Sequence, residues 1–179
     1  GRGDQIHVYP LSFKEFYSYS NKSFDDAYLE YQYYGGMPYL INLDTDERKQ
    51  EYLKQLFSEI YIKDITERNG IKDIKSFENL LCVLSSSIGS YTNPTNLENT
   101  FKSVEKIIYG HVTIKNHIEF IKDAFLISEA KRYDIKGKKY IGSNSKYYFT
   151  DIGLRNALIN FRQNEPTHIM ESIIFNELI

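Results

Sequence analysis

The sequence has a single cysteine, no tryptophan, no long apolar run and almost no net charge. With Cys82 alone, a disulfide within the chain and any metal site with several cysteine ligands are excluded. Because Cys82 lies in an apolar run, we expect it to be buried and inert. No apolar run approaches the roughly 20 residues that a membrane-spanning helix needs, and no secretory signal is present, so we expect a cytoplasmic protein without membrane contact. The net charge of −2 means that a nucleic-acid surface would require local clustering of basic residues.

The sequence also lacks the residue patterns that common catalytic and metal sites need. It contains no Gly-x-x-x-x-Gly-Lys-Ser/Thr run, the loop that binds nucleotide phosphates through backbone N–H groups and a lysine. His111 and His117 are six residues apart, which places them at different angles on a helix, and His7 and His168 are isolated. No serine or cysteine has a base at short range. We therefore expect no catalytic residue, metal or cofactor in this chain.

What the sequence does contain is typical of a globular protein with a substantial core. Hydrophobic residues make up 41% and charged residues 26% of its 179 residues. The 16 Tyr and 11 Phe are the unusual feature. Because tyrosine can pack in a core and still expose its hydroxyl group, we interpret them as amphipathic packing rather than as a stacking surface.

The first residues predict one short strand followed by two helices. The strand covers Ile6–Tyr9. Ser12 and Glu15 have the spacing of a capping box, which begins the first helix. A tyrosine-rich helix over Tyr28–Tyr34 ends at Gly35-Gly36-Met37-Pro38, because two glycines followed by proline stop a helix.

A longer helix is predicted to begin near Asp44–Glu47 and to end near Glu67, before Asn69-Gly70. Arg68 is expected to pair with Asp64 one turn earlier. We place a domain boundary near residues 70–75. The apolar face of this helix is expected to contain Leu53, Leu56, Phe57, Ile60 and Tyr61.

Three further helical patterns and a hairpin follow the boundary. The first helix is predicted to start at Ser76 and to stop at Gly89, and the third follows Gly110, a tight turn of the helix-turn-helix type. Strands are predicted at residues 125–133, 139–141 and 146–149 around a turn at 136–138, and a closing helix is capped at 150–151. The predicted buried residues of the three helices are Phe77, Leu80, Leu81, Leu84 and Ile88, then Leu97, Phe101, Val104 and Ile108, then Ile114, Ile118, Ile121 and Phe125.

These patterns predict a fold class that is mainly α with a small β-hairpin wing. A helical, lid-like segment would cover residues 1–72 and a winged-helix domain residues 73–163. Residues 164–179 would begin a further module, because the chain starts without Met and stops inside an apolar periodic run. We therefore expect it to be cut from a longer protein at both ends.

Several short blocks, in order along the whole chain, resemble the C-terminal region of a bacterial and archaeal family of AAA-type P-loop ATPases, a domain of unknown function that contains a winged helix. The blocks cover residues 1–16, Gly35–Pro38, residues 61–71, 87–93, 120–127, 146–155 and 170–178.

The resemblance implies that a P-loop and an acidic, magnesium-binding strand precede this chain in a longer protein. ATP and magnesium would bind only to that N-terminal ATPase core, which would be a partner of this chain, and Arg2 would lie close to the nucleotide. The resemblance also implies a nuclease-like fold beyond residue 179, with Glu171 as its first carboxylate. One carboxylate alone cannot hold the metal ions of phosphodiester hydrolysis.

The strongest local charge signal is the basic hairpin, Lys131–Lys146, where only Asp134 opposes six basic residues. Such a hairpin can lie along a phosphate backbone, although lysines also keep exposed hairpins soluble. Lys and Asn on the third helix could meet base edges in a major groove, whereas Glu119 is unfavourable there. The candidate nucleic-acid-binding residues are Lys115, Asn116, Lys122, Lys131, Arg132, Lys136, Lys138, Lys139 and Lys146.

The favoured hypothesis is an interaction and regulatory region of an AAA-type ATPase, without ATP binding or hydrolysis of its own, whose basic hairpin contacts DNA and whose other surfaces contact proteins. The first alternative is a stand-alone winged-helix module that binds nucleic acid, such as a transcription regulator. The second alternative is part of a nuclease fold that requires Glu171.

Overall fold

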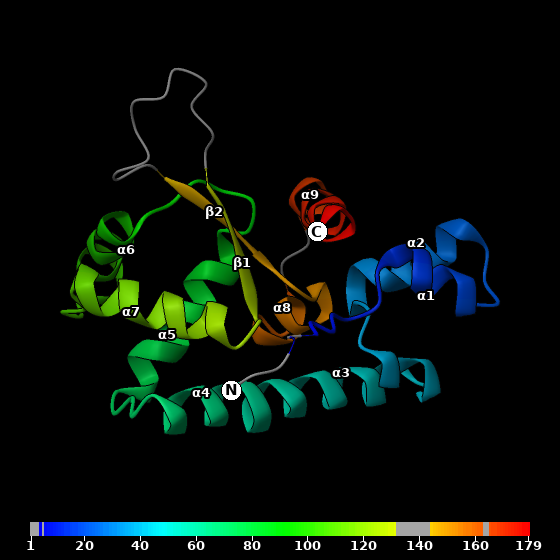
Figure 1. The fold of residues 1–179 in the computed structure, drawn as a ribbon, viewed down its shortest axis with the longest axis horizontal. Coiled ribbons are helices and arrows are strands. Elements are labelled where there is room, and N and C mark those ends of the chain that lie inside the picture. Colours follow the sequence, from blue (N-terminus) through cyan, green and yellow to red (C-terminus); the bar gives the residue numbers. More distant parts are fainter. Residues whose placement is uncertain (1–3, 5, 132–143, 163–164) are drawn as a thin grey trace, which may run out of the picture.

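The structure, a computed structural model, describes residues 4, 6–131, 144–162 and 165–179. Helices account for most of these residues, and two short strands form a sheet (Figure 1). The predicted fold class, mainly α with a small β-hairpin, is therefore confirmed. In chain order the elements are α1 (Phe13–Tyr19), α2 (Phe24–Tyr34), a 3₁₀ turn (Pro38–Asn42), α3 (Asp46–Gln55), a π-helical stretch (Leu56–Ile62), α4 (Lys63–Arg68), α5 (Ile74–Ser86), α6 (Pro94–Thr100), a second π-helical stretch (Phe101–Glu105), α7 (His111–Asp123), β1 (Ile127–Lys131), β2 (Ser145–Phe149), α8 (Ile152–Leu158) and α9 (Pro166–Leu178).

The helices are grouped around the sheet and α8. In Figure 1, α3 and α4 form one long rod along one side of the molecule, with α1 and α2 at one end and α6 and α7 at the other. β1, β2 and α8 lie between these groups, and α9 packs on the side of β2 and α8. Residues far apart in the sequence therefore meet in the centre of the molecule.

The start of α1 and the end of α2 lie where the sequence predicts, but α2 begins at Phe24, four residues before the predicted Tyr28. The side chain of Ser12 accepts a hydrogen bond from Glu15 N, and the Glu15 carboxylate accepts one from Ser12 N, so the capping box is confirmed. α2 ends at Gly35, whose φ of 76° lies in the left-handed region that glycine adopts without a steric penalty. The predicted strand over Ile6–Tyr9 is wrong, because these residues form an exposed segment without strand pairing.

The predicted long helix corresponds to α3, the first π-helical stretch and α4, which follow one another without a break. The predicted pair between Arg68 and Asp64 forms on its surface. Leu53 and Phe57 are buried as expected, but Ile60 is 56% exposed. The wider π-helical turn changes the angle between successive side chains, so an α-helical spacing no longer places Ile60 on the buried face.

α5 begins three residues earlier than the sequence suggested, because Asp73 rather than Ser76 is its N-cap. The Asp73 carboxylate accepts a hydrogen bond from Ser76 N at 3.1 Å. The predicted inward face of α5 is confirmed, since Phe77, Leu80, Leu81, Leu84 and Ile88 are all buried. Cys82 was expected to be buried, but it lies on the exposed side of the helix.

β1 and β2 pair in antiparallel orientation, from Ile127 opposite Phe149 to Lys131 opposite Ser145. Thr92, in the connection between α5 and α6, adds a single bridge to the free edge of β2, with hydrogen bonds of 2.9 Å in both directions between Thr92 and Ser145. The predicted strand at residues 139–141 and the turn at 136–138 lie outside the described residues.

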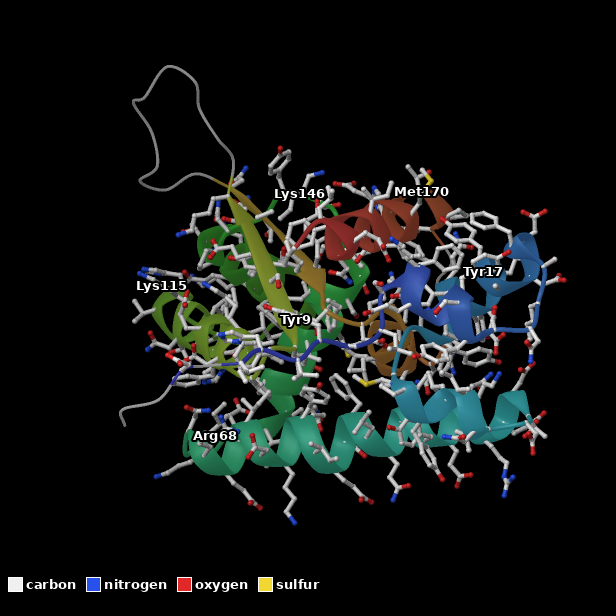
Figure 2. All side chains as sticks on the ribbon, turned by 45° about the vertical axis from the view of Figure 1, so that its right-hand side comes forward. Tyr9, Tyr17, Arg68, Lys115, Lys146 and Met170 are labelled. Atoms are coloured by element: carbon white, nitrogen blue, oxygen red, sulfur yellow. The ribbon has the colours of Figure 1, made fainter. Side chains whose placement is uncertain are left out.

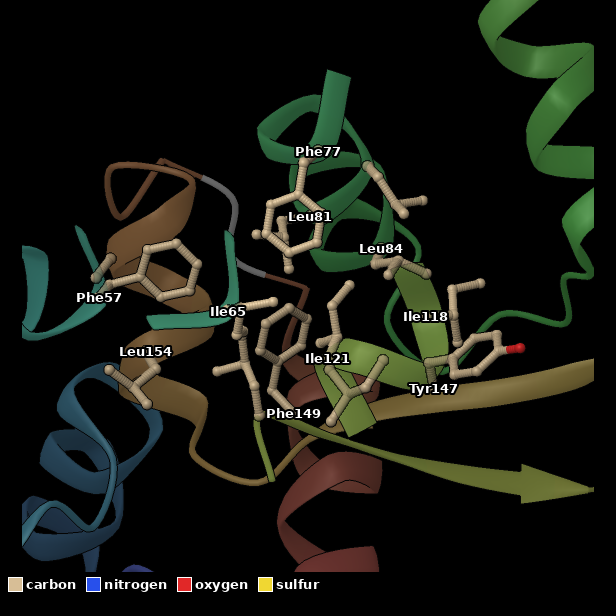
Figure 3. Close-up of a cluster of buried hydrophobic side chains, with 14 of the residues drawn as sticks. Phe57, Ile65, Phe77, Leu81, Leu84, Ile118, Ile121, Tyr147, Phe149 and Leu154 are labelled. Carbon is tan, nitrogen blue, oxygen red and sulfur yellow. The ribbon is translucent and has the colours of Figure 1, made fainter. Parts of the chain in front are cut away.

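The main hydrophobic core joins the two predicted segments. Leu53, Phe57 and Ile65, from the predicted lid-like segment, pack with residues of the predicted winged-helix domain in one cluster (Figure 3). The domain boundary near residues 70–75 remains a prediction, but the residues on its two sides share a core. The members from the second segment that Figure 3 labels are Phe77, Leu81, Leu84, Ile118, Ile121, Tyr147, Phe149 and Leu154.

A second, smaller cluster attaches α9 to the molecule. Ile169 and Ile173 of α9 pack with residues of α1, α2 and the segment after α5. The helix is therefore docked on the described part of the chain through its apolar face. The other members of this cluster are Phe16, Ala27, Tyr31, Ile88 and Ile152.

Asp151, at the start of α8, connects this helix to the end of α2. Its carboxylate accepts hydrogen bonds from Leu154 N at 2.9 Å and from Gly36 N at 2.7 Å. The backbones approach so closely that a Cβ atom on Gly35 would come within 2.6 Å of Gly153 N, and one on Gly153 would overlap the Tyr34 carbonyl. We call this contact between residues 32–36 and 150–156 the α8 junction.

Other polar side chains of the α8 junction bind backbone carbonyl groups of neighbouring elements. The side chain of Asn156 donates hydrogen bonds to the carbonyl oxygens of Gln32 and Tyr33, both at 2.9 Å, in the last turn of α2. Arg155 is fully buried and donates from Nε to Ser85 O of α5 at 2.9 Å. These bonds satisfy carbonyl groups that have no partner within their own helices. The junction thereby positions α2, α5 and β2 relative to one another.

Candidate nucleic-acid interface

The sequence-predicted nucleic-acid residues divide into two sets. Lys115, Asn116, Lys122, Lys131 and Lys146 belong to the described part of the chain. Arg132, Lys136, Lys138 and Lys139, together with the proposed nucleotide-proximal Arg2, lie outside the described residues.

Lys115 and Asn116 are neighbours on the outer face of α7. The helix buries Ile114, Ile118 and Ile121 in the main core, so the two polar residues are directed to the surface. Both are exposed, and Figure 2 shows Lys115 on the outer side of this helix. Their donors and the amide oxygen of Asn116 are therefore accessible to a ligand.

Lys122, near the end of the same helix, is held by two carboxylates. Its Nζ lies 2.8 Å from Glu129 on β1 and 3.0 Å from Glu119 on α7. Glu129 also accepts a hydrogen bond from Ser145 Oγ at 2.7 Å. Partial burial disfavours the charged form of Lys122, but the hydrogen bonds to Glu129 and Glu119 outweigh it and raise the pKa of Lys122. Its charge is therefore balanced within the protein.

Lys146, on β2, lies against α9. Its Nζ donates to Glu171 Oε1 at 2.6 Å, and the hydroxyl of Tyr148 donates to the same oxygen at 2.6 Å. Lys146 and Tyr148 are two residues apart on one strand, so their side chains leave the same face of the sheet. Nζ of Lys146 also lies 5.1 Å from the centroid of the Tyr91 ring, within the range of a cation–π contact.

The environment of Glu171 favours its charged form. Partial burial raises the pKa of this carboxyl group, but the hydrogen bonds from Lys146 and Tyr148 lower it by more. The net shift of the pKa is therefore downward. Gly89, after α5, has a φ of 71°, and a Cβ atom there would come within 3.1 Å of Glu171 Oε2. The missing side chain of Gly89 leaves room for the carboxylate. We call Gly89, Tyr91, Lys146, Tyr148 and Glu171 the Glu171 cluster.

Sequence reasoning found only part of this cluster. Lys146 was predicted as a nucleic-acid contact, and Glu171 as the carboxylate that the nuclease alternative requires. Tyr91 and Tyr148 were not singled out, although the alternation of Lys146 and Tyr148 along a predicted strand indicates a shared face. The contact between β2 and α9 could not be predicted, because no local pattern specifies a partner 25 residues away.

A cavity of about 500 Å³ lies between α2, α3 and the end of α8, and none of the candidate nucleic-acid-binding residues lines it. On its wall, Glu30 pairs with Lys22 at 2.5 Å and with the buried Lys49. The ring of Tyr34 lies 5.2 Å from Nζ of Lys49. Asp46 also lines the cavity, so its two lysines are matched by two carboxylates.

The described residues contain neither a clustered metal site nor a helix able to span a membrane. No group of three or more His, Cys, Asp and Glu side chains there is close enough to bind a metal ion together. In the same residues no helix has the length and apolar character to cross a membrane.

Comparison with known proteins relates the chain to a family and to two longer proteins. The family described as Domain of unknown function (DUF8612) matches residues 25–165. An uncharacterised protein of Haemophilus influenzae is 35% identical over the full chain, which covers 46% of that protein. An uncharacterised protein of Methanocaldococcus jannaschii is 28% identical over 99% of the chain, which covers 42% of that protein. The chain thus spans less than half the length of these relatives. No solved structure matches it significantly.

Proposed function

We propose a function from geometry for this chain, which belongs to the family described as Domain of unknown function (DUF8612). It is an interaction and regulatory region of a longer ATP-driven protein. In this region α5 to β2 act as a winged helix. The winged-helix proposal rests on the order of the elements along the chain: the helix α5, the bridging residue Thr92, the helices α6 and α7, and the hairpin of β1 and β2. Thr92 pairs with Ser145 at the edge of β2, the place of the short first strand in such domains. α7 then takes the position of the recognition helix.

Two observations support the assignment to an ATPase. The blocks that resemble the ATPase family at Gly35–Pro38 and at residues 146–155 are more than a hundred residues apart, yet they meet in the α8 junction. They therefore act as one structural unit, as parts of a single family pattern would. More than half of each relative lies outside the matched region, which leaves room for a nucleotide-binding core. In this proposal that core binds ATP and magnesium.

The ATPase proposal predicts that the longer protein contains a P-loop before residue 1 and hydrolyses ATP. Hydrolysis should require the P-loop lysine, and the chain alone should show none. Arg2→Ala in the longer protein should lower kcat by roughly tenfold or more, because Arg2 would lie close to the nucleotide phosphates. Arg68→Ala is the control, since Arg68 pairs with Asp64 on the surface of α4. A gene that begins near residue 1 without a P-loop would contradict the proposal.

The same winged helix is proposed to contact DNA through Lys115 and Asn116 of α7 and through the basic hairpin. The exposure of these two α7 residues supports this surface. Lysine and asparagine donate hydrogen bonds to phosphate oxygens and base edges, and basic residues on a hairpin add sequence-independent attraction.

The DNA contact predicts salt-dependent binding of a random-sequence duplex by the chain alone. Lys136→Glu combined with Lys138→Glu should weaken binding roughly tenfold or more and reduce the salt slope by about two. Lys63→Glu with Lys72→Glu reverses the same number of charges outside α7 and the basic hairpin, and should change affinity far less. Fluorescence anisotropy at several salt concentrations measures both effects. No binding at low salt, or equal losses in the two double variants, would refute the DNA contact.

A stand-alone regulator is the alternative that the same observation favours. It predicts the same DNA binding, but its gene would start close to residue 1 and encode no P-loop. The gene sequence on both sides of this chain therefore separates the two functions without a binding experiment.

A further inference from the structure

α9 places a carboxylate on the part of β2 that the proposed function assigns to nucleic acid. Figure 2 shows Lys146 at the edge of the molecule where α9, marked by Met170, runs past the strand. The carboxylate of Glu171 receives hydrogen bonds from Lys146 and Tyr148 on a single oxygen, each 2.6 Å long. An acidic group of the chain itself thus occupies the position where two donors converge.

The two donors are of the kinds that bind phosphate groups in nucleic-acid complexes. Lysine ammonium and tyrosine hydroxyl groups both contact backbone phosphate oxygens. A carboxylate oxygen and a phosphate oxygen accept the same charge-assisted hydrogen bonds from such donors. One phosphate oxygen in place of Glu171 Oε1 would keep both bonds.

We propose that Lys146 and Tyr148 form a phosphate-binding position for nucleic acid and that Glu171 fills this position when nucleic acid is absent. The inference rests on the proposed DNA contact of the winged helix and adds its regulation. Nucleic acid and Glu171 compete for the same donors, so binding releases Glu171 from β2. By reciprocity, any change that withdraws Glu171 increases affinity for nucleic acid.

The surroundings suit an exchangeable contact. The side chains of Lys146 and Glu171 are 22% and 37% exposed, so water and ligand reach the pair and its separation carries little desolvation cost. The Tyr91 ring contacts Lys146, so the lysine retains one of its present contacts after Glu171 leaves. Gly89 gives the carboxylate its space without donating a side-chain hydrogen bond to it.

The test is the affinity of the chain for a fluorescein-labelled random-sequence duplex. Glu171→Gln keeps the size of the side chain but removes its charge, and should raise affinity roughly three- to fivefold, the value of one partly exposed ion pair. The salt slope should become steeper by about one. Glu165→Gln is the control, because it removes the same charge from the start of α9, where Glu165 contacts His168 rather than a basic-hairpin residue.

Three further variants separate position from net charge. Glu171→Asp keeps the charge but shortens the side chain, so it should give part of the gain. Lys146→Gln should lower affinity, and Glu171→Gln added to it should produce no gain. Tyr148→Phe should reduce the gain of Glu171→Gln, because one of the two donors is then missing. Far-UV circular dichroism and melting temperature identify variants that have lost α9 or the fold. Only the affinities of the variants that remain folded are compared.

The outcomes distinguish this inference from the proposed function. If Glu171→Gln and Glu165→Gln raise the affinity for the duplex equally, or if neither raises it, the proposed competition is wrong. Binding by the wild type would still support the DNA contact in that case. A gain for Glu171→Gln that persists when Lys146 is replaced also overturns it. Absence of binding in wild type and all variants refutes the DNA contact and the inference together. A selective gain that depends on Lys146 supports both.

Discussion

Gly153→Ala is expected to destabilise the protein by at least about 3 kcal/mol, which corresponds to roughly 10 °C in melting temperature. A Cβ atom at this position would overlap the carbonyl oxygen of Tyr34 at the end of α2 and would come within 3.0 Å of Asp151 Oδ1. The overlapping atom belongs to the backbone, so no side-chain rotation relieves the contact. α8 would have to move away from α2 and break the α8 junction.

Gly110→Ala provides the control for this substitution. A Cβ atom on Gly110 has no atom within 4 Å, and the residue has an ordinary φ of −67° before α7. Alanine is a poorer N-cap than glycine, so a loss of at most about 1 kcal/mol is expected. Urea and thermal unfolding followed by circular dichroism measure both variants. Similar losses at the two positions would show that the close approach at Gly153 is not what limits stability.

Asp151→Ala is expected to cost about 3 to 5 kcal/mol in unfolding free energy, because Gly36 N and Leu154 N would each lose their buried acceptor. Each buried N–H group left without an acceptor carries a desolvation penalty. An N–H group at an exposed cap avoids this penalty because water can accept its hydrogen bond. Asp73→Ala is the matched control, since Asp73 is also an N-cap but is exposed, and its replacement should cost only about 1 kcal/mol. A loss at Asp151 no larger than at Asp73 would contradict the role of the α8 junction.

Asp151 also predicts a pH dependence with a defined sign. Burial raises the pKa of its carboxyl group from 3.8 to about 6, against the lowering effect of the backbone N–H groups of Leu154, Gly36 and Gly153. A folded-state pKa above the unfolded value means that the stability from this group is complete below about pH 4. It is lost as the pH rises through about 6, by about 3 kcal/mol in total.

The comparison that isolates this effect uses Asp151→Asn, which cannot ionise. The unfolding free energy of the wild type relative to this variant should fall by about 3 kcal/mol between about pH 4 and pH 7. Urea unfolding at a series of pH values measures the difference. A constant difference, or one that increases with pH, would show that the carboxyl group is not buried as the structure describes.

Local chemistry accounts for what could be predicted from the sequence. The capping box at Ser12 and Glu15, the stop at Gly35 and the inward face of α5 follow from caps, glycine and helical spacing, and each is found in the structure. The errors have local causes too. The π-helical stretch turned Ile60 outward, and a single apolar run wrongly predicted Cys82 to be buried. The predicted burial of Val104, Ile108 and Phe125 is also wrong, since all three are exposed. Periodicity assumes one regular helix geometry, and an unbroken apolar run does not by itself show which of its residues lie on the exposed side.

The candidate interface could be predicted in part, because some of its features also depend on local sequence. The basic hairpin and the surface position of Lys115 and Asn116 follow from composition and spacing. The carboxylates that balance Lys122 and Lys146 do not, because Glu129 and Glu171 reach them only through the sheet and the docking of α9. Whether Lys146 is accessible to a ligand therefore depends on the position of Glu171 on α9.

The mainly α fold class, the positions of most helices and the concentration of positive charge in the basic hairpin can be predicted from the sequence. The contact of Asp151 with Gly36, the burial of Arg155 beside α5, and the position of Glu171 on Lys146 and Tyr148 cannot. The difference lies in the range of the interactions. Caps, turns and helical faces act between residues a few positions apart, whereas these contacts join residues 23 to 115 positions apart and exist only once the helices have packed.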